Sequence, residues 1–256
     1  MELSIDELRV FLDQKSQQYN HSDFISSDPI QIPKRFHKKE DIEIAAFLSA
    51  IIAWGNRASI IKSASKLMSI MGDQPHDYII HSTKSDWEAI GQFVHRTFNI
   101  IDLRYCFQAL QHLYLHHGGL HGALRPTPEE EFMDDAICRF RSLFFAVDDP
   151  KRTGKHIANP AKGSAAKRIH MFLRWMVRKD NNGVDFGLWS DIPPSKLSCP
   201  LDVHTGNIAR KLGLLKRKPN DQRAVRELDQ QLRILDPIDP VKYDFALFGL
   251  GVFEKF

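Results

Sequence analysis

Apolar residues along the chain recur at intervals of three and four positions, the spacing that places them on one face of a helix. Six segments have this pattern: residues 41–71, 100–117, 130–147, 164–180, 219–235 and 239–253. We find no convincing run of alternating apolar and polar residues, the pattern of a half-buried strand. The hydrophobic pattern therefore predicts an all-α protein.

Several predicted helices begin with residues that favour a helix start. Ser164 is placed to cap the helix over 164–180, and an Asn or Asp opens the segment over 219–235. Asp239 followed by Pro240 is typical of a cap and a first helical position. These signals strengthen the helical prediction in the C-terminal half of the chain.

Composition narrows the class of protein. The 256 residues are 43% hydrophobic and 26% charged, as in an ordinary globular protein. No apolar run approaches the roughly 18 residues that a membrane span needs, and the polar N-terminus does not resemble a secretory signal. Cys106, Cys138 and Cys199 lie far apart, which argues against disulfides and metal clusters. We therefore expect a cytoplasmic protein without membrane contact.

Charge is distributed unevenly, although the net charge is only +3. Residues 151–218 contain fifteen Lys or Arg and four Asp or Glu, a net charge of +11 that leaves −8 for the rest. Arg174 and Arg178 belong to this segment and fall largely off the apolar face of their predicted helix. Such a basic patch is typical of a nucleic-acid partner. The alternative is a solvated helical surface, which mutual repulsion among so many bases disfavours.

Two motifs lie inside this basic segment: "KGSAAKRIHMFLRWMV" and "CPLDVHTGNIARKLGLL". Together they resemble the core of the helix-hairpin-helix base-excision DNA glycosylases. In that superfamily a glycine-rich hairpin ends in a lysine at the head of a helix, and a later "VDxHxxRxxxRLG" segment carries an aspartate. The stretch "LDVHTGNIARKLG" fits this second segment closely. The archaeal-type 8-oxoguanine DNA glycosylases resemble it most, and we expect an uncharacterised bacterial family to share these motifs.

Weaker matches occur on both sides of this core, in the order that the superfamily has. Residues 47–68 resemble the early helix, and residues 243–251 resemble the closing helix. The resemblance implies one unit of two helical subdomains with a cleft between them. Its parts would be a first helical part over about 40–150, the hairpin and aspartate segment over 151–218, and closing helices over 219–256.

The implied function is removal of an oxidised purine such as 8-oxoguanine from DNA by base flipping, with AP-lyase activity. The partner would be lesion-containing duplex DNA, and the protein would be a monomer associated with a bacterial nucleoid. The resemblance implies no cofactor and no metal. Two alternatives stay open: a non-catalytic DNA- or RNA-binding protein on the same fold, and a metal-dependent hydrolase.

Lys167 and Asp202 are the implied catalytic residues. A lysine amine can attack the sugar carbon and form a Schiff base. A carboxylate can stabilise the oxocarbenium-like state of glycosidic cleavage, and a helix start after Pro200 would hold Asp202 rigidly and favour its ionised form. The alternatives are that Asp202 is only a helix cap and that Lys167 is a surface lysine.

Three further residues would bind the flipped base. Asp244 and Phe248 lie four positions apart, on one face of the closing helix, where a carboxylate could accept from a guanine edge and a ring could stack on it. Asn56 falls near the position at which the early helix of that superfamily carries a polar residue. Alternatively, Phe248 belongs to the core and Asp244 is solvated. Trp54 could be a wedge, although a core position fits better.

DNA-backbone contacts are expected from six residues of the two motifs: Lys162, Gly163, Ser164, Arg168, His204 and Arg210. The hairpin departs from the superfamily pattern, because the second glycine of GxG is absent after Gly163. Phosphate contact there is expected to differ. The insert between Lys179 and Cys199 is also long, so the sequence does not give the distance between the two motifs in space.

Histidines cluster in "HLYLHHGGLHGAL", where His112 and His116 share a helix face. Such a pair can bind a metal, but the HExxH arrangement and an obvious third ligand are both missing. Surface or partly buried histidines are the favoured interpretation.

Overall fold

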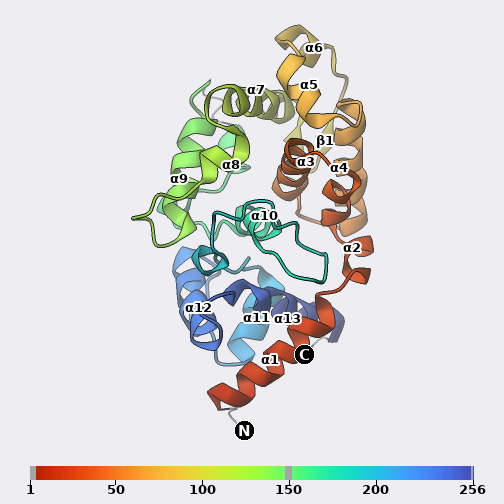
Figure 1. Cartoon of the computed structure of the whole chain (residues 1–256). Coiled ribbons are helices and arrows are strands. Elements are labelled where there is room, and N and C mark those ends of the chain that lie inside the picture. The colour runs from red at the N-terminus through yellow and green to blue at the C-terminus, as the bar shows by residue number, and fades with distance from the viewer. Residues whose placement is uncertain (1–3, 148–151, 255) are drawn as a thin grey trace. The chain divides into compact units, whose positions relative to one another are not determined.

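The computed structural model describes residues 4–147, 152–254 and 256, and it is mainly helical (Figure 1). This confirms the prediction of an all-α protein. The chain divides into two compact units. Unit 1 consists of residues 1–24, 131–133 and 160–256, and unit 2 of residues 25–130 and 134–159. Within the described ranges, no helix combines the length and the apolar content needed to cross a membrane.

Unit 2 is built from short and medium helices that surround a small hairpin. Its helices are α3 (Lys39–Ile51), α4 (Arg57–Ile70), α5 (Pro75–His81), α6 (Lys84–Ala89), α7 (Ile100–His116), α8 (Gly119–Leu124) and most of α9 (Met133–Phe144). The hairpin pairs β1 (Val94–His95) with β2 (Phe98–Asn99) in antiparallel fashion. These strands are too short to produce an alternating pattern in the sequence.

The helical pattern over 41–71 is divided into two helices, α3 and α4. Gly55 lies between them with φ 103°, a backbone conformation that other residues rarely adopt. Asn56 then caps α4, its side chain accepting a hydrogen bond from the Ser59 backbone N–H (3.3 Å).

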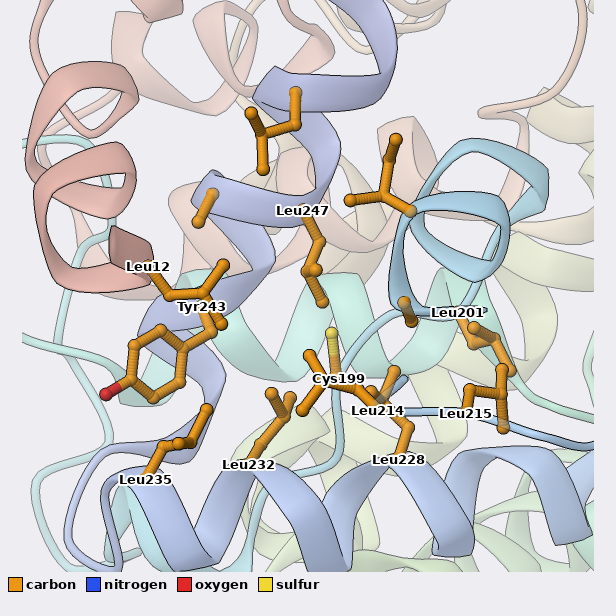
Figure 2. Close-up of a cluster of buried hydrophobic side chains, with 14 of the residues drawn as sticks. Leu12, Cys199, Leu201, Leu214, Leu215, Leu228, Leu232, Leu235, Tyr243 and Leu247 are labelled. Atoms are coloured by element: carbon orange, nitrogen blue, oxygen red, sulfur yellow. The ribbon is translucent and has the colours of Figure 1, made fainter. Parts of the chain in front are cut away.

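Unit 1 contains α1 (Ile5–Tyr19), α10 (Lys167–Val177), α11 (Val203–Lys211), α12 (Gln222–Leu235) and α13 (Tyr243–Gly249), and a π-helical turn (Leu250–Glu254) follows α13. Apart from α10, all of these helices contribute side chains to one hydrophobic cluster (Figure 2). Figure 2 shows the Cys199 thiol at the centre of the cluster, with Leu247 of α13 above it and Leu228 and Leu232 of α12 below. Elements far apart in sequence therefore share one core.

One predicted helix cap is wrong. Helix α10 begins at Lys167, and Ser164 lies outside it, accepting instead from the Ala166 backbone N–H (3.2 Å). Asp239 and Pro240 do stand at the cap and the first position of a short 3-10 helix, Pro240–Lys242. The Asp239 side chain makes no cap hydrogen bond there, and its carboxylate accepts from Arg178 Nε at 2.9 Å. The predicted cap of α12 is confirmed at Asp221, which accepts from the Ala224 backbone N–H.

Arg174 and Arg178 are buried rather than on a solvated helix face. The sequence pattern placed them off the apolar face, but acidic side chains from later elements cover them. Arg174 pairs with Asp185 and Asp244, and Arg178 pairs with Asp185 among others. Their charges are therefore neutralised inside unit 1 and add little to a basic surface.

The insert over 179–199 is folded against α10. The backbone N–H of Phe186 donates to the Trp175 carbonyl (2.8 Å), and that of Trp189 donates to the Met176 carbonyl (3.0 Å). These bonds satisfy carbonyls in the last turn of α10, because carbonyls there have no N–H partner within the helix. The insert thereby returns the chain to the segment before α11.

Candidate active site

Lys167 and Asp202 form an ion pair. Lys167 Nζ lies 3.2 Å from Asp202 Oδ2. The Lys167 side chain is 35% exposed and the Asp202 side chain 15% exposed, so the pair is accessible from one side and partly shielded from water. Both residues stand at helix starts, Lys167 as the first residue of α10 and Asp202 as the cap of α11. The structure therefore brings the two predicted catalytic residues together within unit 1.

The carboxylate of Asp202 has a separate partner for each oxygen. Oδ1 accepts from the Thr205 backbone N–H at 2.8 Å, which is the N-cap bond of α11, and Oδ2 faces Lys167. Asp202 is therefore a helix cap and also the ion-pair partner of Lys167. The cap bond fixes the carboxylate, and the second oxygen stays directed at the amine.

The backbone of Asp202 is held by a segment that sequence analysis did not connect to it. Asn220 donates its side-chain N–H to the Asp202 carbonyl (2.9 Å), and Arg210 Nη2 donates to the Asn220 side-chain oxygen (2.6 Å). Arg210 also binds the Arg217 carbonyl. Gly206 lies next to both side chains, and a Cβ there would lie 2.8 Å from the Asn220 oxygen, so that a larger residue would shift these side chains. Arg210, predicted to contact DNA, therefore braces the site.

The predicted hairpin forms a turn before α10. Gly163 has φ 83° and is exposed, and a Cβ on this residue would meet no atom within 4 Å. Its carbonyl accepts from the Gln222 backbone N–H (3.1 Å), which joins the turn to the start of α12. Ala165 occupies the place of the missing second glycine and packs partly against the hydrophobic cluster. Lys162 precedes the turn and is exposed.

Arg168 and His204 follow the two catalytic candidates on their helices. Arg168 is half-buried, and burial lowers the pKa of its guanidinium to about 10. His204 is exposed in the first turn of α11. Gly251 of the π-helical turn approaches it closely, since a Cβ at that glycine would lie 3.0 Å from His204 Cβ.

Asp244 is buried close to the ion pair, so its solvated alternative is wrong. Arg174 Nη1 binds one carboxylate oxygen, and the Cys199 thiol donates to the other at 3.8 Å. Burial raises the pKa of Asp244 to about 6; Arg174 and Lys167 oppose this rise, and Asp202 adds to it. Through the Cys199 thiol, Asp244 contacts the segment that leads into Asp202.

The other two predicted base-binding residues have different surroundings. Phe248 is half-buried, with its ring edge-on to Phe24 at 6.2 Å. Asn56 belongs to unit 2 and caps α4. The neighbouring Trp54 is half-buried and stacks on His156 with ring centroids 5.5 Å apart. Base binding by Asp244, Phe248 and Asn56 stays a prediction.

The histidine cluster lies at the end of α7. His112 Nε2 and His117 Nε2 are 3.1 Å apart, and the ring of His116 is 5.0 Å from that of His112. Among the described residues, no three or more His, Cys, Asp or Glu side chains are arranged to hold a metal ion.

Four residues at the site were missed as functional candidates: Arg174, Asp185, Cys199 and Asn220. For Arg174 a signal was present, because it lies seven positions after Lys167 and a spacing of seven keeps two residues on one helix face. For Cys199 and Asn220 no local pattern carries the information, since their partners are distant in the chain.

Fold and site together define an all-α protein with a partly shielded lysine–aspartate pair at two helix starts. The chain belongs to the family described as "Protein of unknown function (DUF2400)", whose model matches residues 28–253. Searches of curated proteins and of solved structures find no match.

Proposed function

We propose that this protein is a DNA glycosylase with AP-lyase activity that removes an oxidised purine, such as 8-oxoguanine, from duplex DNA. The observation that carries the proposal is the 3.2 Å pair between Lys167 and Asp202. The motifs that resemble the helix-hairpin-helix glycosylases place this lysine and aspartate 35 positions apart in the chain, yet the two side chains meet in space. A chance surface lysine would have no reason to meet that aspartate.

The chemistry assigns one role to each residue. The Lys167 ammonium first loses a proton to water, and the neutral amine then attacks the sugar C1′ while the bond from C1′ to the base breaks. The electron pair of that bond leaves with the base, which takes up a proton. The attacking nitrogen loses a proton, and opening of the sugar ring gives a Schiff base. Loss of a C2′ proton then expels the 3′ phosphate. Asp202 stabilises the positive charge that develops on the sugar.

DNA would approach over exposed basic side chains in the segments that join the site. Lys162 precedes the Gly163 turn, and Lys216 and Lys218 lie in the segment that leads to Asn220. That segment touches the Asp202 carbonyl through Asn220, and the turn touches the start of α12. Short stretches of chain, held by hydrogen bonds, thus connect these ammonium groups to the site. Phosphate contacts made by them would fix the position of the site on the duplex.

Borohydride trapping on a panel of lesion-containing duplexes tests the proposal, with wild type, Lys167→Gln and Asp202→Asn compared. We expect the wild type to be trapped on at least one oxidised purine, because borohydride reduces the Schiff base to a stable adduct. Lys167→Gln lacks the amine and should give no adduct. Asp202→Asn keeps the cap and should trap at least about a hundredfold more slowly.

Absence of both trapping and base release on every lesion would overturn the proposal. If all three proteins then bind duplex DNA equally and in a salt-sensitive manner, the protein is a non-catalytic binder. Base release without an adduct would leave glycosylase activity and remove the lyase step.

A further inference from the structure

We propose that Arg174 is a positioning residue, which holds the carboxylate of Asp244 and so leaves Lys167 to pair with Asp202 alone. The effect of Arg174 on catalysis rests on the proposed function above. Its effect on the charge of Lys167 does not depend on that function. Arg174 Nη1 binds the Asp244 carboxylate, while Lys167 Nζ lies 3.2 Å from Asp202, so each cation holds a different carboxylate.

Arg174 is held from three directions. Its Nη1 binds Asp244, its Nε lies 3.3 Å from Asp185 Oδ1, and its guanidinium stands 4.2 Å from the ring centroid of Phe245. A planar guanidinium suits such a position, because it can bind two carboxylates and stack on an aromatic face at once. Lys167 lies two turns earlier on the same helix, so the helix fixes the separation of the two cations.

The competition that Arg174 prevents follows from burial. Asp244 is almost inaccessible to water, and the charge of a buried carboxylate must be met by a partner or by a proton. The groups facing it are Arg174, the Cys199 thiol, and, at longer range, Asp202 and Lys167. Of these groups, Lys167 is the cation that acts on Asp244 besides Arg174.

Lys167 would respond by holding its proton to higher pH, because an additional unpaired anion stabilises its charged form. The neutral amine is the nucleophile, so the reactive fraction would fall. Replacing Asp244 by Asn in the same chain removes the competing charge and should restore the amine.

Arg178 offers a matched control. It is on the same helix four residues later, is equally buried, and pairs with Asp185, Asp239 and Asp180. Its guanidinium also faces Phe245, at 5.5 Å. The decisive difference is that its ion pairs are with other carboxylates, whereas Arg174 binds Asp244. Loss of either arginine breaks a buried network, but only loss of Arg174 frees Asp244.

The experiment measures the titration of Lys167 directly. Lysines of the full-length protein are reductively methylated with isotope-labelled formaldehyde, and the signal of Lys167 is identified by its loss in Lys167→Arg. We expect the pH midpoint of this signal to rise by about one unit in Arg174→Met relative to wild type, an effect of about tenfold on the neutral fraction. Arg178→Met and Arg174→Met/Asp244→Asn should stay near the wild-type midpoint.

Equal midpoints in Arg174→Met and Arg178→Met would overturn the proposal, and so would failure of Asp244→Asn to reverse the shift. If Arg174→Met does not fold, the test uses Arg174→Gln with the same second substitution. Wild-type trapping is measured in parallel: its absence counts against the proposed function, whereas the titration still decides the role of Arg174. Where trapping occurs, Arg174→Met should be slower than wild type at a pH at which Asp244 is ionised, and adding Asp244→Asn should restore the rate.

Discussion

At the scale of single residues, Asp202 shows how one side chain can carry a structural and a chemical role. Its Oδ1 completes the first turn of α11, while its Oδ2 faces Lys167. Serine also caps helices well but cannot carry a negative charge. The two roles are therefore separable by substitution.

Asp202→Ala should lower the free energy of unfolding by about 1 kcal/mol, because the cap bond is removed. Asp202→Ser should lower it by less than about 0.5 kcal/mol, because its hydroxyl can accept from the Thr205 N–H. Both variants should lose borohydride trapping. Urea denaturation gives the stabilities; equal destabilisation by Ala and Ser would show that the cap bond contributes little.

At the scale of elements, α12 holds the loop that leads into Asp202. Arg233 binds the carbonyls of Ser195 and Leu197, and Asp229 accepts from the Cys199 backbone N–H at 3.0 Å. These bonds satisfy backbone groups of a buried loop that has no helix or sheet to do so. The position of the site thus depends on a helix that contributes no predicted catalytic side chain.

The buried Asp229 should make stability depend on pH. Burial raises its pKa to about 6, so the folded protein keeps this proton to higher pH than the unfolded chain, which ionises near about pH 4. Asp229 should therefore lower the free energy of unfolding as pH rises from about 4 to about 6, and should cause no further change above that range. Asp229→Asn removes this pH dependence. Urea unfolding at a series of pH values measures both proteins; parallel curves would contradict the expectation.

Packing of α1 against α13 leaves no space at Gly249. A Cβ there would lie 2.1 Å from the Tyr19 ring, so Gly249→Ala should destabilise the protein by about 1–3 kcal/mol through overpacking. Gly91→Ala is the control, since a Cβ at Gly91 has no atom within 4 Å. Thermal or urea unfolding compares the two. Similar stabilities would mean that α1 shifts to accommodate the methyl group.

The elements were predictable to different degrees for physical reasons. Helical periodicity is a local signal, and it predicted the segments that contain α3, α4, α7, α9, α10, α12 and α13. It did not predict α1, α5, α6 or α8, nor the break between α3 and α4. Burial of Arg174 and Arg178 was not predictable, because the carboxylates Asp244 and Asp239 come 70 and 61 positions later. The meeting of Lys167 with Asp202 depends likewise on the insert between them, which is fixed by backbone bonds to α10 that no side-chain pattern records.

At the scale of the whole molecule, the basic segment is less basic in effect than its sequence suggests. Of its fifteen bases, Arg174 and Arg178 are buried and paired. Lys162, Lys216 and Lys218 are exposed in unit 1, which also contains the candidate site. We expect part of the non-specific affinity for DNA to come from these lysines.

The double variant Lys216→Gln/Lys218→Gln should bind duplex DNA more weakly than wild type. The slope of log affinity against log salt should fall in magnitude by about 2, because each neutralised phosphate contributes roughly 0.9 to that slope. Lys84→Gln serves as the control, because Lys84 is a highly exposed lysine of α6 in unit 2. Fluorescence anisotropy over a range of salt concentrations measures wild type and both variants. An unchanged slope in the double variant would exclude these lysines from the DNA interface.

The order of the segments has a consequence for synthesis on the ribosome. Unit 1 begins before residue 25 and resumes at residue 160, so unit 2 is inserted into it. We expect unit 2 to fold on the emerging chain before α1 packs, because Leu8 and Leu12 of α1 pack against helices that are synthesised later. At ordinary translation speeds, the interval between synthesis of α1 and synthesis of α13 is on the order of ten seconds or more. The lysine–aspartate pair is thus assembled last, and a nascent chain that stops early carries a folded unit 2 without the candidate site.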